Sequence, residues 1–186
     1  MPACDAVPVL VVMAGLPASG KSAVAEGLAK ALKCAVLSVD PVEAAMWRAG
    51  VGREQPTGLA AYVVAEALAA EQLGLGQDVI VDAVNAVEPA REQWRQLADR
   101  TDSRLRFIEV RCSDEAEHRR RLERRQRGID GMPEPDWDSV QARRAGFDDW
   151  QDDRLVLDSM APLDELLRLA LDHLAATGAV ARGQEG

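Results

Sequence analysis

The 186-residue sequence is poor in the residues that form disulfides or bind transition metals: it has three cysteines and two histidines. Cys4, Cys34 and Cys112 are odd in number and far apart in the chain, so neither a disulfide framework nor a metal site is indicated. His118 and His173 are isolated, which indicates neither a metal site nor a catalytic dyad. We therefore expect other residue types to carry the chemistry.

The sequence also lacks an excess of basic residues and a long apolar run. Its 22 Lys and Arg against 31 Asp and Glu give a net charge of −9 and a pI near 4.8, which argues against broad binding to nucleic acids or anionic membranes. No apolar run approaches membrane-spanning length, and no secretory signal pattern is present. We therefore expect a cytoplasmic protein that binds no membrane and for which nucleic acid is a disfavoured partner; its oligomeric state is not indicated.

The remaining composition is that of an ordinary globular protein, with 47% hydrophobic and 28% charged residues. A chain of 186 residues is long enough for one domain with a sizeable core. We therefore expect a single domain over residues 1–186, with a frayed tail at 175–186.

One motif dominates the sequence: residues 15–22 are Gly-Leu-Pro-Ala-Ser-Gly-Lys-Ser, a complete match to G-x-x-x-x-G-K-[ST]. Residues 9–14 before it are an unbroken apolar run, typical of a strand buried on both faces. After it, Val24, Leu28 and Leu32 recur at helical spacing. The alternative is a chance match, which arises about once per hundred chains of this size, and the flanking strand and helix make it rarer. We conclude that this is a nucleotide-binding P-loop.

Each residue type in the loop has a physical role. Glycines let backbone N–H groups approach the phosphates, the lysine reaches the β- and γ-phosphates, and the hydroxyl of Ser22 joins the shell of Mg²⁺. The sequence therefore predicts ATP and Mg²⁺ as ligands. The expected nucleotide-binding residues are Gly15, Ala18, Ser19, Gly20, Lys21 and Ser22.

Short apolar strands alternate with helical patterns along the chain. This order predicts βαβ units and a five-stranded parallel sheet with helices on both faces. The strands are expected at 9–14, 35–39, 79–81, 105–110 and 155–157, and the helices after 21 and at 42–49, 59–73, 89–98, 114–127, 139–145 and 163–174. Ligands of such sheets bind beyond the carboxyl ends of the strands. The P-loop, Asp40 and Asp82 each follow a strand, so we expect them on one edge.

Asp40 is the candidate general base. Placed at the end of the second strand, its carboxylate should lie near the phosphate held by Lys21 and could accept a proton from an attacking hydroxyl. The alternative is an N-cap, because Asp followed by Pro41 is a common helix start. We favour the catalytic role, and the two are compatible.

Two further polar residues follow the third predicted strand. Asp82 resembles a Walker-B carboxylate, which would bind Mg²⁺ through water or orient the substrate; the alternative is a turn residue at a strand end. Asn85 could hydrogen-bond a substrate or serve ordinary turn chemistry.

The densest positive charge is at residues 119–127. Arg121 and Arg125 share a helix face, and we expect them to stabilise the charge of phosphoryl transfer from a lid that spans about residues 113–138. The alternative is a solvated surface paired with glutamates, which should describe most of these arginines.

These features resemble the small P-loop kinases of the adenylate-kinase-like group, and within it chloramphenicol phosphotransferase and polynucleotide 5′-kinases. The resemblance implies ATP as donor, Mg²⁺, Asp40 as base, Lys21 as phosphate ligand, and lid arginines around Arg121 and Arg125. Polynucleotide kinases of this kind tend to carry an arginine shortly after the base, whereas Arg48 is the first cation here. We assign Arg48 to the substrate side.

The leading hypothesis is thus a kinase that transfers the ATP γ-phosphate to a hydroxyl of a small molecule. One alternative is a polynucleotide or nucleoside 5′-hydroxyl kinase. The other is a regulatory nucleotide-binding ATPase that acts on a protein partner. A closed pocket beside Asp40 would count against this regulatory ATPase, which needs no acceptor site.

Overall fold

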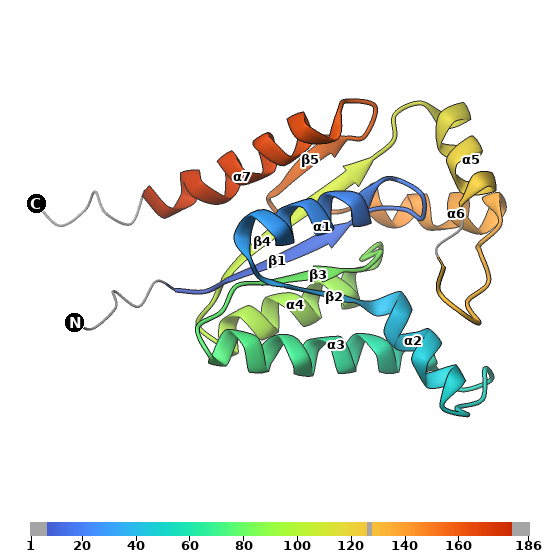
Figure 1. Cartoon of the computed structure of the whole chain (residues 1–186), viewed down its shortest axis with the longest axis horizontal. Helices are drawn as coiled ribbons and strands as arrows, with labels where there is room; N and C mark the ends of the chain where they lie inside the picture. The colour runs from blue at the N-terminus through green and yellow to red at the C-terminus, as the bar shows by residue number, and fades with distance from the viewer. Residues whose placement is uncertain (1–6, 126–127, 180–186) are drawn as a thin grey trace, which may run out of the picture.

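A five-stranded parallel sheet forms the centre of the molecule (Figure 1) in the computed structural model, which describes residues 7–125 and 128–179. The strand order is β2-β3-β1-β4-β5, and all four pairings are parallel. The strands are β1 (Val9–Ala14), β2 (Ala35–Ser38), β3 (Val79–Asp82), β4 (Arg104–Arg111) and β5 (Arg154–Asp158). The apolar run of β1 is buried throughout because this strand lies in the middle of the sheet.

Helices cover both faces of the sheet, which confirms the predicted fold class. They are α1 (Lys21–Leu32), α2 (Val39–Arg48), α3 (Thr57–Gly74), α4 (Glu88–Arg100), α5 (Glu115–Arg124), α6 (Trp137–Arg144) and α7 (Leu163–Ala179), with a 3₁₀ turn at Ala145–Phe147. One core joins α1 and α7 to the sheet, and a second joins α3 and α4 to its other face. None of the helices in the described residues is both long and apolar enough to cross a membrane.

The start of α2 differs from the prediction. Strand β2 ends at Ser38, and α2 already includes Val39, so Asp40 is the second helical residue and does not end the strand. Pro41 explains the early start, since its fixed φ suits the first turn, where its missing N–H costs nothing. Ser38 occupies the N-cap position, so the predicted capping role of Asp40 is also wrong.

Two other helix ends differ from the prediction by three residues or more. Helix α5 ends at Arg124 because Arg125 has extended backbone, with ψ 128°; the rest of the predicted helix, residues 126 and 127, lies outside the described residues. Helix α7 continues to Ala179, five residues beyond its predicted end, because alanines such as Ala175 and Ala176 favour helix. The remainder of the predicted tail, 180–186, lies outside the described residues.

Candidate active site

The loop between β1 and α1 has the backbone that phosphate binding requires. Its φ angles are positive at Gly15 (145°), Ala18 (64°) and Gly20 (96°). A Cβ at Gly15 would lie 2.4 Å from the carbonyl oxygen of Val110, so no larger residue fits without moving the backbone. Left-handed residues within such a turn produce the concave array of N–H groups that binds anions. The loop then delivers the N-terminus of α1 to the same place.

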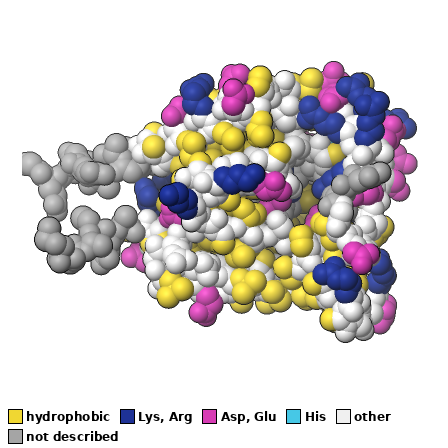
Figure 2. Space-filling model, viewed as in Figure 1, with side chains coloured by type: hydrophobic (Ala, Val, Ile, Leu, Met, Phe, Trp, Pro, Cys, Tyr) yellow, Lys and Arg dark blue, Asp and Glu magenta, His cyan; other side chains and the backbone are white. Residues whose placement is uncertain are grey.

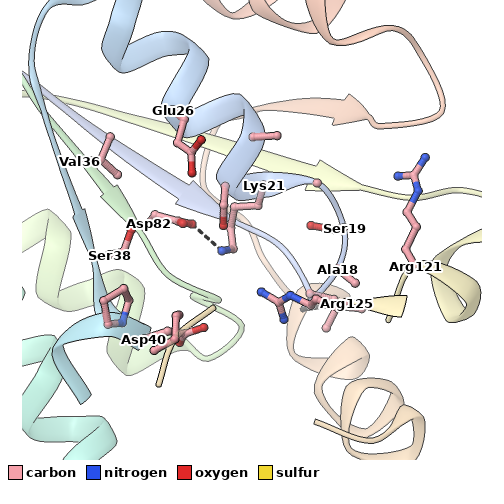
Figure 3. A pocket seen from close by; sticks show the side chains of 16 residues that line it. Ala18, Ser19, Lys21, Glu26, Val36, Ser38, Asp40, Asp82, Arg121 and Arg125 are labelled. Carbon is pink, nitrogen blue, oxygen red and sulfur yellow. Dashed lines mark hydrogen bonds and ion pairs between the residues drawn. The ribbon is translucent and has the colours of Figure 1, made fainter. Parts of the chain in front are cut away.

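Lys21 and Asp82 form a buried ion pair at the centre of the site. Lys21 is the first residue of α1 and Asp82 the last of β3. Lys21 Nζ donates to Asp82 Oδ1 at 2.5 Å, and the two residues are 8% and 7% exposed (Figure 3). Because a buried charge needs a partner, this contact holds the ammonium at the mouth of the P-loop.

Ser19 carries an unmet hydrogen-bonding group. It is 1% exposed, and its Oγ has no hydrogen-bond partner among the described residues. Leaving a buried hydroxyl unpaired is costly, and a phosphate oxygen in the loop would accept its hydrogen bond. The glycine cradle, the lysine and this hydroxyl therefore fit nucleotide phosphates. Ser22 and Asp82 supply the oxygen ligands that suit Mg²⁺.

Nine of the twelve predicted residues line one cavity of about 490 Å³, a size typical of small-molecule sites. Gly15 lines a second cavity, which shares Leu16 and Ser19 with the first. Figure 3 shows the side chains that line the first cavity, which come from the P-loop, α1, β2, α2, β3 and the region of α5. The predicted residues on its wall are Ala18, Ser19, Gly20, Lys21, Ser22, Asp40, Asp82, Arg121 and Arg125. Glu26, one turn after Ser22 on α1, also lines the cavity and was not predicted, although its i,i+4 spacing from Ser22 could have indicated it.

Asp40 lines this cavity from the first turn of α2. Its neighbour Tyr62 reports on the electrostatics of this wall: burial, and then the charges of Asp40 and Asp82, raise the pKa of Tyr62 to about 12. The Tyr62 hydroxyl accepts a hydrogen bond from the Asn85 N–H at 3.3 Å. The carboxylates of Asp40 and Asp82 thus both act on the same hydroxyl group, that of Tyr62.

Asn85 lies just outside the cavity, and its side chain bonds to the protein. It is fully buried in the left-handed region (φ 52°). Its Nδ2 donates to the Met13 carbonyl at 2.7 Å, and its Oδ1 accepts from Trp94 Nε1 at 2.9 Å. These contacts favour the turn interpretation, in which Asn85 fixes the end of β1 before the P-loop. A contact with substrate stays a prediction.

Arg48 is not among the residues that line the cavity. Its Nη1 donates to the Asp130 carbonyl at 3.3 Å, and nearby Arg53 donates to the carbonyl of Gly131. Both bonds join the α2–α3 region to the loop after α5, whose Ile129 lines the cavity. This part of the predicted lid segment therefore already reaches across the site.

The two predicted lid arginines face the cavity while bound to other groups. Arg121 donates to Glu117 Oε1 at 2.7 Å, and also to the hydroxyl and carbonyl oxygens of Ser159. Arg125 lies 3.6 Å from the carboxylate of Glu134. Both arginines therefore line the cavity while their guanidinium groups contact other groups of the protein.

His118 attaches α5 to the P-loop. Its Nε2 donates to the carbonyl oxygen of Pro17 at 2.8 Å, and its ring meets Trp137 edge to face. Burial is the main cause that lowers its pKa. This histidine looks isolated in the sequence, because its partner is a backbone carbonyl 101 residues away in the chain.

Comparisons with known proteins agree with this geometry. A family model described as an AAA domain matches residues 10–147. A protein from Chloroflexus aurantiacus is 21% identical, with a TM-score of 0.71 over 90% of this chain and 99% of that one. A gluconokinase from Sinorhizobium meliloti is 22% identical, with a TM-score of 0.66 over 97% and 99% of the two chains.

The APS kinase of Mycobacterium tuberculosis, in complex with AMPPNP and APS, is 18% identical, with a TM-score of 0.66 over 90% and 98% of the chains. At these identities the likeness concerns the fold. No curated protein matches the sequence. A particular likeness to chloramphenicol phosphotransferase does not emerge from the comparisons.

Proposed function

Since the chain belongs to the AAA domain family, we propose that it is an ATP-dependent kinase that transfers the γ-phosphate to a hydroxyl of a small molecule. One observation carries the proposal: a P-loop suited to phosphates shares a single cavity with a carboxylate, Asp40, and with two arginines. The kinases among the structural neighbours support it, since a gluconokinase and an APS kinase have the same fold.

The proposed roles follow from the chemistry of each group. Asp40 takes the proton of the acceptor hydroxyl while the acceptor oxygen bonds to the γ-phosphorus and the bond to the leaving ADP breaks. Lys21, Arg121 and Arg125 stabilise the negative charge on the transferred group. Ser22 and Asp82 would hold Mg²⁺, which neutralises phosphate charge when bound.

The cavity favours a small acceptor over the two alternatives. Ile129 of the loop after α5 lines the same cavity as Asp40, and bonds from Arg48 and Arg53 hold the following residues, 130–131, against the α2–α3 region. A regulatory ATPase would need no such acceptor space. The net charge of −9 disfavours a polynucleotide acceptor.

The decisive experiment measures ADP release with ATP and Mg²⁺ across a panel of acceptors matched in size. The panel holds neutral, acidic and amino-bearing polyols, nucleosides and a 5′-hydroxyl oligonucleotide. We expect turnover to rise many-fold with one small-molecule class and the phosphate to appear on its hydroxyl. A rise only with the nucleosides or the oligonucleotide, or no rise with any acceptor, would overturn the proposal.

A further inference from the structure

Helix α3 buries its small side chains and exposes its large ones. The residues that face the sheet include Ala61, Ala65 and Ala69, all fully buried. The opposite face carries apolar side chains that are 38–71% exposed at Leu59, Val63, Val64, Leu68 and Leu75, with exposed alanines at 60 and 67 between them. Figure 2 shows this apolar surface along the lower edge, where Figure 1 has α3. We name residues 59, 60, 63, 64, 67 and 68 the outer stripe.

The outer stripe is unusual for a helix that faces water. A surface helix normally presents charged residues on its outer face. Among its 18 residues α3 has two charged side chains, Glu66 and Glu71, and Glu66 is bound to Gln93 and Arg100 of α4. The stripe and Leu75 expose on the order of 500 Å² of apolar surface, at the upper end for a monomer. Patches at this end of the range are often functional.

We propose that the outer stripe is the contact between two copies of this chain, with their α3 helices antiparallel. The stripe complements itself about its midpoint between Val63 and Val64. An antiparallel pair then places Leu59 opposite Leu68 of the second copy and the alanine at 60 opposite that at 67. The alanines at 60 and 67 flank the crossing point, and their small side chains let the two helix axes approach to about 8–10 Å.

Charge limits where two copies can meet and favours this direction. The chain carries a net charge of −9, which opposes the association of two copies, and this repulsion is weakest across a surface without acidic groups. The outer stripe is such a surface, and Glu71 lies beyond it. In the antiparallel arrangement the two Glu71 side chains are roughly 20 Å apart, from the rise of 1.5 Å per residue. A parallel pair would bring them side by side, which disfavours that arrangement.

The area of the outer stripe sets the expected stability of the dimer. Without Leu75, the outer stripe offers on the order of 400 Å² on each copy, a total near 800 Å² that lies in the range of weak, transient interfaces. We therefore expect a dimer that dissociates on dilution. Sedimentation velocity of the full chain over a wide concentration range should show the mass change from 20.1 kDa to twice that value. A wild-type protein that stays monomeric throughout would overturn the proposal.

A matched pair of variants tests whether α3 is the contact. Val63→Glu should be monomeric at every concentration, because the introduced charge would lie within the stripe. Leu169→Glu on α7, where the leucine is 37% exposed, should still dimerise. Circular dichroism should be unchanged in both, since neither side chain is buried. Dimers of Val63→Glu as stable as those of the wild type would assign the contact to another surface.

A cross-linking experiment tests the direction. In the antiparallel pair, residue 60 faces residue 67 of the second copy, whereas like positions lie about 10 Å apart, too far for a disulfide. A mixture of Ala60→Cys and Ala67→Cys should therefore cross-link far more than either variant alone, with wild type as the control for the native cysteines. Equal cross-linking of the single variants would overturn the arrangement.

Discussion

The two sides of the proposed active site are built differently. On the P-loop side, Ser19 and Lys21 are almost completely buried, and the backbone adopts positive φ angles that cost free energy. On the lid side, the side chain of Arg121 is 30% exposed, and it is held by Glu117 on its own helix. The P-loop is thus fixed before any ligand binds. The lid arginines are held by contacts that a ligand could replace.

This difference has an energetic basis. Partly exposed ion pairs such as that between Arg121 and Glu117 contribute about 0–1 kcal/mol, so exchanging Glu117 for a phosphate requires little free energy. The buried pair of Lys21 and Asp82 cannot lose a partner as cheaply. Substitutions in the P-loop should therefore weaken ATP binding as well as transfer, whereas substitutions in the lid segment should mainly slow the transfer step.

The largest effect is expected for Lys21→Ala. Removing the ammonium should weaken ATP binding and lower transfer by roughly 10³-fold or more, as measured by calorimetry and ADP release. It also leaves Asp82 without its partner, which should lower the free energy of unfolding. The double variant Lys21→Ala/Asp82→Asn should recover stability but not binding.

The exposed Lys30 on the same helix provides the control, and Lys30→Ala should behave as wild type. Near-normal ATP affinity and turnover in Lys21→Ala would show that the P-loop assignment is wrong, and the contrast with the lid would disappear.

Asp40→Asn should have the next largest effect. Asp40 belongs to neither side. Because it is the proposed general base, its substitution should lower the transfer rate roughly 10²–10⁴-fold while ATP affinity is retained. Glu26→Gln, which changes a second carboxylate on the same cavity wall, should change the rate less than tenfold. Preserved rates with a lower melting temperature would assign Asp40 a structural role.

The P-loop side was predictable because its determinants are local. Eight consecutive residues determine the conformation at Gly15 and Gly20, and Asp82 is the last residue of a strand that its apolar run makes recognisable. The parallel sheet then brings the P-loop and Asp82 to one edge. This part of the site was therefore available from sequence periodicity and the motif.

The other side was less predictable, because it depends on long-range contacts. Asn85 binds Met13, 72 residues away, and Arg48 binds the backbone of a loop 82 residues away. No sequence pattern indicates such partners. The start of α2 was misplaced by three residues because Asp40-Pro41 suits both a strand end and a first helical turn.

Substitutions of the lid arginines should have a smaller effect than those in the P-loop. Arg121→Ala and Arg125→Ala should each lower kcat roughly 10- to 100-fold and change the affinity for ATP less, because these contacts strengthen in the transition state. Arg119→Ala is the matched control, since this arginine is exposed and paired with Glu123. Hydrogen exchange of the lid segment should slow with an ATP analogue and acceptor together. Normal transfer rates and normal hydrogen exchange in all three variants would show that α5 is a charged surface without a role in transfer.

The smallest effect concerns a contact that joins the two sides, from His118 to the carbonyl of Pro17. Burial, together with Arg144 and Arg121, lowers the pKa of His118, while the bond to Pro17 and the charge of Glu115 oppose this. The unfolded chain therefore takes up a proton at His118 at a higher pH than the folded protein does. The stability associated with neutral His118 is present above the ordinary value of 6.5 and is lost as the pH falls below it.

His118→Gln keeps a donor near Pro17 but removes the titrating group. The free energy of unfolding of the wild type should therefore fall relative to that of His118→Gln between pH 7 and pH 5, by at most about 1.4 kcal/mol per pH unit. Chemical denaturation of both proteins at several pH values measures this difference, and it cancels the carboxylates that titrate in both. If the two curves stay parallel, the link between α5 and the P-loop does not depend on the charge of His118. The lid segment would then keep its contact with the P-loop in acid, and the contrast between a fixed side and an exchangeable side would hold at every pH tested.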